Sequence, residues 1–284
     1  MKRTFLSPLT LWFACGIAYA QPTAQPAEPA AIDPAPAEST TPGDPPETTR
    51  DAAPPQDLNE ALQRLNLPGI KISVEEWSVD VEATVSLRHG LLELIACVKD
   101  TKEHESIVAV NAKPSHIHAA LLLIGANPGN PAVRKIVGEG DDARFIELPP
   151  RGDLVDVYLV INSEDGPQQH PISDFIEMAR DDFDHLGNPV TYDDEPDPFP
   201  GHSFLFTGSV LVERGEGEPR QYIADYSGNV ITLVTFGDEM MSKPGFHDDA
   251  NHALMWQVKN TKLPELDSAV TLRFKPQRGK AATE

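Results

Sequence analysis

The clearest periodic pattern in the chain is a two-residue alternation between Val79 and Leu87. Apolar residues at the odd positions alternate there with Asp80, Glu82, Thr84 and Ser86, which predicts a strand with one buried face. Three further apolar runs are predicted strands of the same meander: Ile70–Val74, Leu91–Val98 and Glu103–Val110. His89-Gly90 fits a two-residue hairpin loop, and the polar Lys99–Lys102 fits a four-residue loop.

The pattern changes to a helical period after this meander. Pro114 suits the first turn of a helix, where its missing N–H costs nothing. Ile117, Leu121 and Ile124 then form an apolar stripe at i, i+4 and i+7, and Gly125 is a C-terminal stop. Two more short helices are predicted at Asp57–Leu65 and Ile172–Arg180.

Two predicted strands come next, Ala143–Leu148 and Asp153–Asn162. A second meander follows and consists of Ser203–Val212, Tyr222–Asp225 and Asn229–Thr235. Leu254–Lys259 and Ala269–Phe274 are the last predicted strands. Short turns join most of them, and no long βαβ alternation appears. The sequence therefore predicts an α+β fold: a single β-rich domain of mostly antiparallel strands in two meanders, with two or three short helices.

The N-terminal region predicts export. Residues 1–20 have a basic start, an apolar middle and an Ala18-Tyr19-Ala20 cleavage site, as in a signal peptide. Cys15 leaves lipidation as an alternative way of processing the leader. Residues 21–56 contain ten prolines and predict a disordered Pro/Ala/Thr/Glu-rich linker. The domain is expected at 57–276, followed by a disordered tail at 277–284.

Charge and cysteine content exclude several classes of protein. The net charge is −21, which argues against nucleic acid or an anionic membrane as a partner. After the leader, no apolar run is long enough to predict a transmembrane segment. Cleavage leaves Cys97 as a lone thiol, so a disulfide framework and an intrachain iron–sulfur site are both excluded.

The loop predicted at Lys99–Lys102 places Cys97 opposite His104 on one face of a hairpin. A thiol beside an imidazole suits a soft metal site or a thiolate nucleophile, and it also occurs as a buried cysteine beside a satisfied histidine. His116 and His118 point about 200° apart on a helix, so only one of them, His118, is expected to face the hairpin. Cys97, His104, Glu105 and His118 form the candidate site for zinc or another transition metal, with Glu105 joining only if the strand is bulged.

Several motifs in this region resemble those of the YdjY-domain family of exported bacterial proteins. The matching pieces are Leu92-Glu93-Leu94, Cys97, Lys102–Ser106, Pro114–Leu121, Gly125, Phe206–Ser209, Tyr222–Asp225 and Gly228–Ile231. The resemblance spans roughly Pro68 to Phe274. It implies export and implies no established biochemical activity.

Two functions follow as hypotheses. The first is a non-catalytic binding module, periplasmic or secreted, whose ligand and cell-envelope partner are unknown. The alternative is a metal-binding protein or metal-dependent enzyme with its site on the Leu91–Gly125 unit. Whether the protein is an enzyme is left open by the sequence, which contains no phosphate-binding glycine loop and no dinucleotide fingerprint.

Overall fold

The computed structural model describes residues 65, 67–181, 186–215, 217–245, 247 and 255–281. The chain divides after Arg50 into two units, and the second, Asp51–Glu284, contains all of the described residues. The predicted signal peptide and linker lie outside the described residues, as does the predicted Asp57–Leu65 helix apart from Leu65. The last strand of the described residues ends at Ala281.

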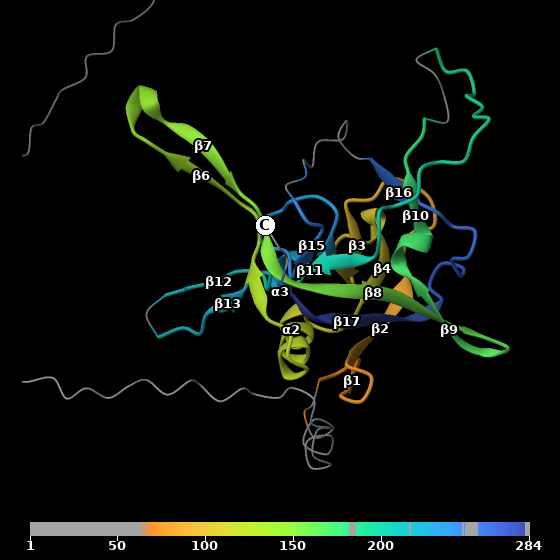
Figure 1. Ribbon diagram of the computed structural model, residues 1–284, viewed down its shortest axis with the longest axis horizontal. Helices are drawn as coiled ribbons and strands as arrows, with labels where there is room; N and C mark the ends of the chain where they lie inside the picture. Colours follow the sequence, from red (N-terminus) through yellow and green to blue (C-terminus); the bar gives the residue numbers. More distant parts are fainter. Residues whose placement is uncertain are drawn as a thin grey trace, which may run out of the picture. The chain divides into compact units, whose positions relative to one another are not determined.

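Eight of the described strands form a closed ring (Figure 1). In order around the ring they are β2 (Ser78–Val85), β17 (Ala269–Ala281), β8 (Arg151–Ser163), β11 (Ser203–Leu205), β15 (Met241–Ser242), β14 (Asn229–Thr232), β3 (Leu94–Val98) and β4 (Ser106–Val110). The pairing of β4 with β2 closes the barrel, with Ala83 opposite Val110 and Val85 opposite Val108. Closure removes the exposed edges that an open sheet would present.

The prediction of two meanders in an α+β domain is wrong, because the strands form one mostly β barrel that mixes the two halves of the chain. β2 pairs with β17, which lies near the other end of the described chain, and β3 pairs with β14. His89-Gly90 does not close a hairpin, since β2 and β3 are not neighbours in the ring. The alternating pattern correctly predicted the buried face of β2 but carried no information about its partners.

The predicted hairpin of Leu91–Val98 with Glu103–Val110 is also wrong, because β3 and β4 run parallel. The residues between the two strands include a 3₁₀ turn, η1 (Glu103–Glu105). They carry the chain from the end of β3 back to the start of β4, so that both strands run in the same direction. Lys99 N–H donates to Val110 O at one end (2.9 Å), and Glu93 N–H donates to Glu105 O at the other (3.3 Å). Both strands are buried on both faces, and such continuous apolar runs are typical of parallel pairs.

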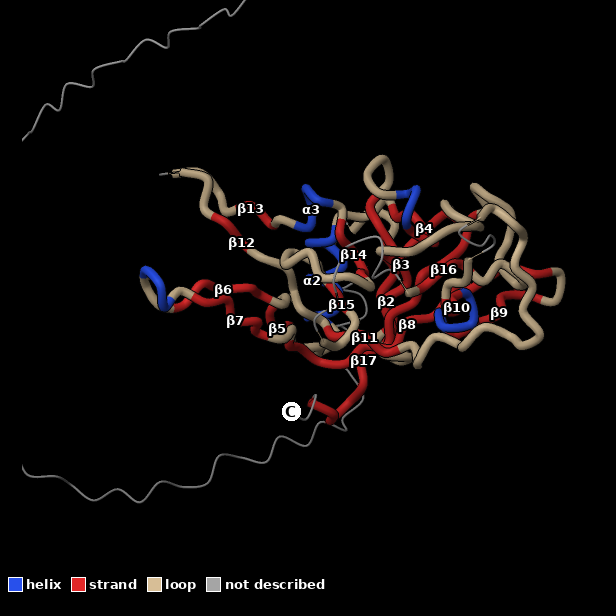
Figure 2. The backbone as a smooth tube through the Cα atoms, turned by 90° about the horizontal axis from the view of Figure 1, so that it is seen from above, coloured by secondary structure: helices blue, strands red, loops and turns tan. Residues whose placement is uncertain are grey.

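The remaining strands extend or flank the barrel (Figure 2). β1 (Ile70–Ser73) pairs with β2, while β5 (Pro128–Asn130) and β9 (Gly166–Pro171) pair with β8. Three two-stranded pairs complete the set: β6 (Val133–Val137) with β7 (Arg144–Leu148), β10 (Ile176–Met178) with β16 (Trp256–Val258), and β12 (Leu211–Val212) with β13 (Gln221–Tyr222). The β6–β7 hairpin extends away from the barrel strands in both views.

The described residues include two α-helices, α2 (Pro114–Leu123) and the single turn α3 (Ala224–Ser227). The predicted start at Pro114 and stop at Gly125, with φ of +87°, are confirmed. The predicted helix at Ile172–Arg180 is wrong beyond its first turn, where η3 (Ile172–Phe175) gives way to β10. A further 3₁₀ turn is η2 (Gly140–Asp142). None of the helices in the described ranges has the length and hydrophobicity that a membrane crossing requires.

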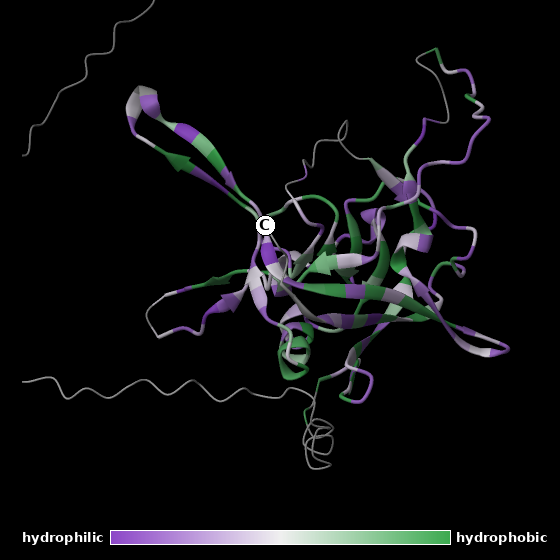
Figure 3. Cartoon of the chain, viewed as in Figure 1, coloured by the Kyte–Doolittle hydropathy of each residue, from purple (hydrophilic) through white to green (hydrophobic). Residues whose placement is uncertain are grey.

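The barrel and α2 share one hydrophobic core. The alternating residues Val79, Val81 and Val85 of β2 are fully buried in it, as are Ile117 and Leu121 of α2. Figure 3 shows α2 as a largely hydrophobic helix and the barrel strands as alternating bands. Burial of a large aliphatic side chain contributes about 1.5–3 kcal/mol to folding, so this shared core fixes the position of α2 against the barrel.

Candidate functional site

Cys97 lies in a small buried cluster and not beside His104. It pairs with Ala109 of β4 and packs with Leu94 and Phe236. Burial raises the pKa of the Cys97 thiol, and hydrogen bonds to Ser106, Lys102 and Thr101 oppose this only in part. A buried protonated thiol is a poor nucleophile and a poor metal ligand.

The other three residues of the predicted metal site lie on η1 and α2. His104 is on η1 with 77% of its side chain exposed, and its Nε2 lies 3.7 Å from Glu105 Oε2. His118 is on α2, where its Nδ1 is 2.9 Å from the Tyr222 hydroxyl. Among the described residues, no group of three or more His, Cys, Asp or Glu side chains is arranged to hold a metal ion. The zinc hypothesis therefore rests on the sequence pattern alone.

His118 instead joins α2 to the segment that follows β11 and to the end of β13. Its ring meets Phe206 edge-on at 4.8 Å between ring centres and is perpendicular to Tyr222 at 5.4 Å. Burial lowers the pKa of His118, although a hydrogen bond to the Gly208 backbone acts in the opposite direction. Burial, with a smaller effect of Asp225, raises the pKa of Tyr222. Burial thus favours the neutral form of both rings, and they form a half-buried polar joint between α2 and β13.

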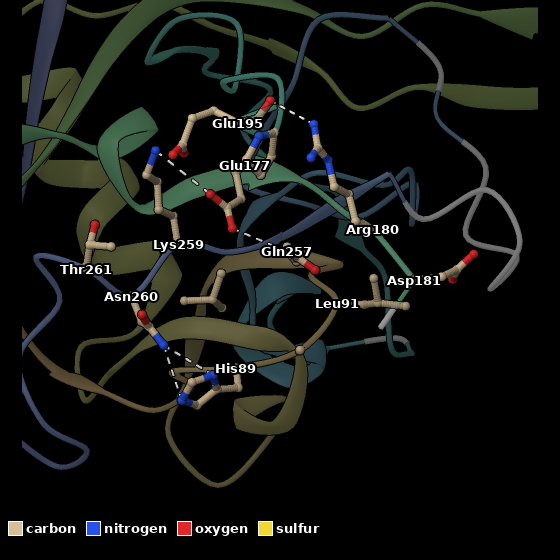
Figure 4. A pocket seen from close by; sticks show the side chains of 13 residues that line it. His89, Leu91, Glu177, Arg180, Asp181, Glu195, Gln257, Lys259, Asn260 and Thr261 are labelled. Atoms are coloured by element: carbon tan, nitrogen blue, oxygen red, sulfur yellow. Dashed lines mark hydrogen bonds and ion pairs between the residues drawn. The ribbon is translucent and has the colours of Figure 1, made fainter. Parts of the chain in front are cut away.

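A cleft of about 740 Å³ opens elsewhere on the domain, beside the β10–β16 pair (Figure 4). Three separate parts of the chain line it: the 89–91 turn, the region from β10 to the 195–196 loop, and β16 with the residues after it. Its volume is in the range of small-molecule sites in proteins, about 300–1,000 Å³. Its charged and amide side chains are Glu177, Arg180, Asp181, Glu195, Gln257, Lys259 and Asn260.

Glu177 is the central acidic group of the cleft. Its Oε1 accepts a hydrogen bond from Gln257 Nε2 at 3.2 Å, and its Oε2 lies 3.8 Å from Lys259 Nζ. Figure 4 shows these three side chains pointing toward one another. Glu177 and Gln257 are directly opposite in the β10–β16 pair, so strand pairing holds them in register. Strand pairing and the Gln257 bond therefore hold the carboxylate in place, and Lys259 is its charged neighbour.

Arg180 and Asn260 stand on the other walls of the cleft. The Arg180 guanidinium donates to the backbone carbonyls of Asp194 (2.6 Å) and Glu195 (2.7 Å) and stacks on the Tyr192 ring. Asn260 Nδ2 lies 3.2 Å from the ring nitrogens of His89. Arg180 thus holds the loop around Asp194 and Glu195 on one side of the cleft. On the opposite side, Asn260 links the residues after β16 to the 89–91 turn.

Sequence patterns alone do not predict this cleft. The sequence predicts His89-Gly90, on one wall of the cleft, as a hairpin turn. Glu177, Gln257 and Lys259 belong to no recognisable motif, and they meet only because β10 pairs with β16. The sequence does contain one signal. Charged and amide residues are dense in and around two short predicted elements, Ile172–Arg180 and Leu254–Lys259.

Comparison with known proteins identifies a family. Residues 70–275 match the model of the family described as the YdjY domain, which confirms the resemblance seen in the sequence motifs. No curated protein matches the chain, and no solved structure matches it. The matched range covers well over half of the 284 residues. The chain therefore belongs to the YdjY-domain family.

Proposed function

We propose that the protein is an exported binding module that holds a small polar molecule in the cleft beside β10 and β16. The observation that carries the proposal is the convergence of Glu177, Gln257 and Lys259 inside a cleft of about 740 Å³. Fixed polar groups of this kind orient a ligand and provide specificity. Three of the lining residues, Leu91, Pro196 and Val258, have apolar side chains, and most of the others are charged or polar, which favours a polar ligand over a lipid.

The side chains of the cleft suit ligand binding better than nucleophilic catalysis. The one cysteine among the described residues is buried away from it, and its Arg180 is engaged with backbone carbonyls. Behind the cleft, Trp256 of β16 meets Phe199 edge-on at 4.8 Å between ring centres. A site on paired strands with a packed aromatic support keeps its shape, which lowers the cost of ordering the side chains when a ligand binds.

A ligand screen with matched lysine variants tests the binding role. The chain from Gln21 onward is screened by thermal unfolding against monosaccharides, amino acids and dipeptides, and any compound that raises the Tm is titrated by calorimetry. A ligand at 100 times its Kd stabilises the folded state by about 2.7 kcal/mol. Lys259→Ala removes the cation beside Glu177, and we expect at least a tenfold weaker Kd. Lys262→Ala is the control, since Lys262 bonds Asp174 outside the cleft lining.

Two results contradict the binding role. One is that no compound of the three classes raises the Tm. The other is that Lys259→Ala and Lys262→Ala bind the same compound equally well, which would place the ligand elsewhere.

Export is the second part of the proposal, and the leader pattern at 1–20 supports it. We expect the intact mass of the protein recovered outside the cytoplasm to correspond to a chain beginning at Gln21. Ala20→Asp should block cleavage because the cleavage site requires small residues, whereas Ala31→Asp in the linker should leave it unchanged. A chain that keeps Met1 and stays in the cytoplasm contradicts export without affecting the binding result.

A further inference from the structure

Buried polar atoms without hydrogen-bond partners are concentrated in one short stretch of the barrel. Within the described part of the chain, four of them belong to residues 229–242: Asn229 Oδ1, Thr232 Oγ1, Glu239 Oε1 and Ser242 Oγ. Glu239 is fully buried and Asn229 is 1% exposed. A buried polar atom without a partner costs about 1–3 kcal/mol, so a native arrangement should satisfy these atoms.

Asn229 and Glu239 lie side by side. β14 and β15 are parallel, with Ile231 beside Met241 and Thr232 beside Ser242. Continuing this register places Asn229 beside Glu239, and the Met240 N–H donates to Asn229 O at 3.1 Å, as that register requires. The two unpartnered oxygens therefore belong to neighbouring residues on adjacent segments.

The other polar atoms of both side chains are already engaged. Glu239 Oε2 accepts from the N–H of Gly237 (2.7 Å) and of Asp238 (3.0 Å). Asn229 Nδ2 donates to Asp238 Oδ1 at 2.6 Å, which fixes the orientation of the amide, because a flip would set its oxygen against the Asp238 carboxylate. Glu239 Oε1 and Asn229 Oδ1 are thus two acceptors that lack one donor.

No described cation compensates a charge on Glu239. The segment packed against it is Thr207-Gly208-Ser209, where the Thr207 hydroxyl and the Ser209 N–H donate to Glu239 O, and this segment is uncharged. Asn229 of β14 is uncharged, and Asp238 is the one neighbour that acts on Glu239 by its charge. Burial raises the pKa of Glu239 above its ordinary value, and this exceeds the opposing effect of the backbone N–H groups.

We propose that Glu239 is a neutral acid in the folded protein at pH values where exposed glutamates are ionised, and that its Oε1–H donates to Asn229 Oδ1. One proton then satisfies both acceptors and joins β14 to the 237–240 segment. The same segment bonds Thr207 and Ser209, which border the His118 joint. This hydrogen bond forms when Glu239 is protonated and is lost when Glu239 ionises. We call it the Glu239 latch.

The latch has a defined pH dependence. The folded protein holds a proton that the unfolded chain releases near the ordinary pKa of 4.5, so between that pH and the raised folded pKa the folded state binds more protons. The free energy of unfolding must therefore fall as the pH rises through this window, and the contribution is fully present below 4.5.

Urea unfolding of the chain from Gln21 onward as a function of pH tests the latch. We expect the stability of the wild type to fall above pH 4.5. We expect Glu239→Gln, which keeps a donor at this position, to remain folded and to lack this fall. Glu164→Gln is the control, since Glu164 is an exposed glutamate in the turn between β8 and β9. In the wild type alone, the Glu239 side-chain carboxyl carbon should titrate by NMR above the other glutamates, which keeps the test valid if Glu239→Gln fails to fold.

Three results overturn the proposal. One is an identical pH slope of stability in the wild type and in a folded Glu239→Gln. Another is a Glu239 carboxyl carbon that titrates with the exposed glutamates. The third is a rise in Tm with added CaCl₂ that Glu239→Gln abolishes, because this would show that a cation, not a proton, bridges the two oxygens.

Discussion

Gly208 is held where a side chain would not fit. Its φ is +80°, and a Cβ built on it would lie 2.7 Å from Pro128 Cβ and 3.1 Å from His118 Cε1. The glycine therefore allows the 207–209 segment to approach α2 closely, which brings His118 against Phe206 and Tyr222. At the residue scale, this contact positions the polar joint between helix and barrel.

Gly208→Ala should destabilise the protein more than a glycine change of equal backbone strain. We expect a loss of about 3 kcal/mol, from left-handed strain of about 1–2 kcal/mol and overpacking against Pro128 and His118. Gly201→Ala is the matched control, because its φ is +78° and no atom lies within 4 Å of the added Cβ; it should lose about 1 kcal/mol. Urea denaturation measures both, and equal losses would show that Gly208 has room for a side chain.

Cys97 should not react with a thiol reagent in the native protein. The side chain is fully buried, so a reagent cannot reach the sulfur. Burial also raises the pKa of the thiol, which disfavours the reactive thiolate. For the chain from Gln21 onward, which lacks Cys15, we expect a single thiol to appear in urea and none in buffer, by absorbance after addition of a chromogenic disulfide. Metal analysis of the same sample bears on the zinc hypothesis. Stoichiometric zinc that Cys97→Ser removes would restore the metal site predicted from the sequence.

At the scale of elements, α2 depends on a cap supplied from elsewhere in the chain. Its own preceding residue, Lys113, provides no side-chain cap. Instead, Asp225 of α3 accepts from the Ser115 N–H (2.8 Å) and the Ser115 hydroxyl (2.7 Å). A carboxylate at a helix N-terminus satisfies a free N–H and interacts favourably with the helix dipole.

Asp225→Ala should therefore cost about 1 kcal/mol of stability, as the loss of an N-cap does. Tyr226→Ala on the same turn is the control, because that side chain is 81% exposed and its removal should change stability little. Thermal unfolding of the two variants makes the comparison. A loss with Tyr226→Ala as large as with Asp225→Ala would mean that α3, not the cap, is being disturbed.

At the scale of the whole molecule, the barrel and its hairpins differ in how much they contribute to the fold. β6 and β7 pair only with each other among the described strands, and Ile136 and Phe145, opposite one another, are 66% and 68% exposed. The β12–β13 pair, by contrast, ends at Tyr222, which bonds His118. The first hairpin is thus an appendage, and the second is tied to the core.

Replacing residues 134–147 by a short Gly-Ser linker should leave the barrel folded, with a stability change of about 1 kcal/mol or less. The equivalent replacement of residues 211–222 should destabilise it by several times more, because the Tyr222–His118 contact is lost. Circular dichroism and urea unfolding report on both. A barrel that unfolds without 134–147 would show that the hairpin stabilises the core.

The parts of the fold that the sequence predicted are those set by local pattern. The alternation from Val79 identified a strand and its buried face, and Pro114 with Gly125 identified α2 nearly to the residue. The partners of the strands were not predictable in this way. Strands pair through backbone N–H and C=O groups, which are alike in every strand and so do not specify a partner. The parallel pairing of β3 and β4 did leave a signal in their continuous apolar runs.

By itself, the sequence determined where elements begin and end, which faces are apolar, and the family to which the chain belongs. Only the tertiary structure decided that the strands close into a barrel, that Cys97 meets Ala109 and not His104, and that Glu177, Gln257 and Lys259 share a cleft. The physical reason is that secondary structure follows from interactions a few residues apart. Strand pairing and sites depend on contacts between segments far apart in the chain, which no local pattern specifies.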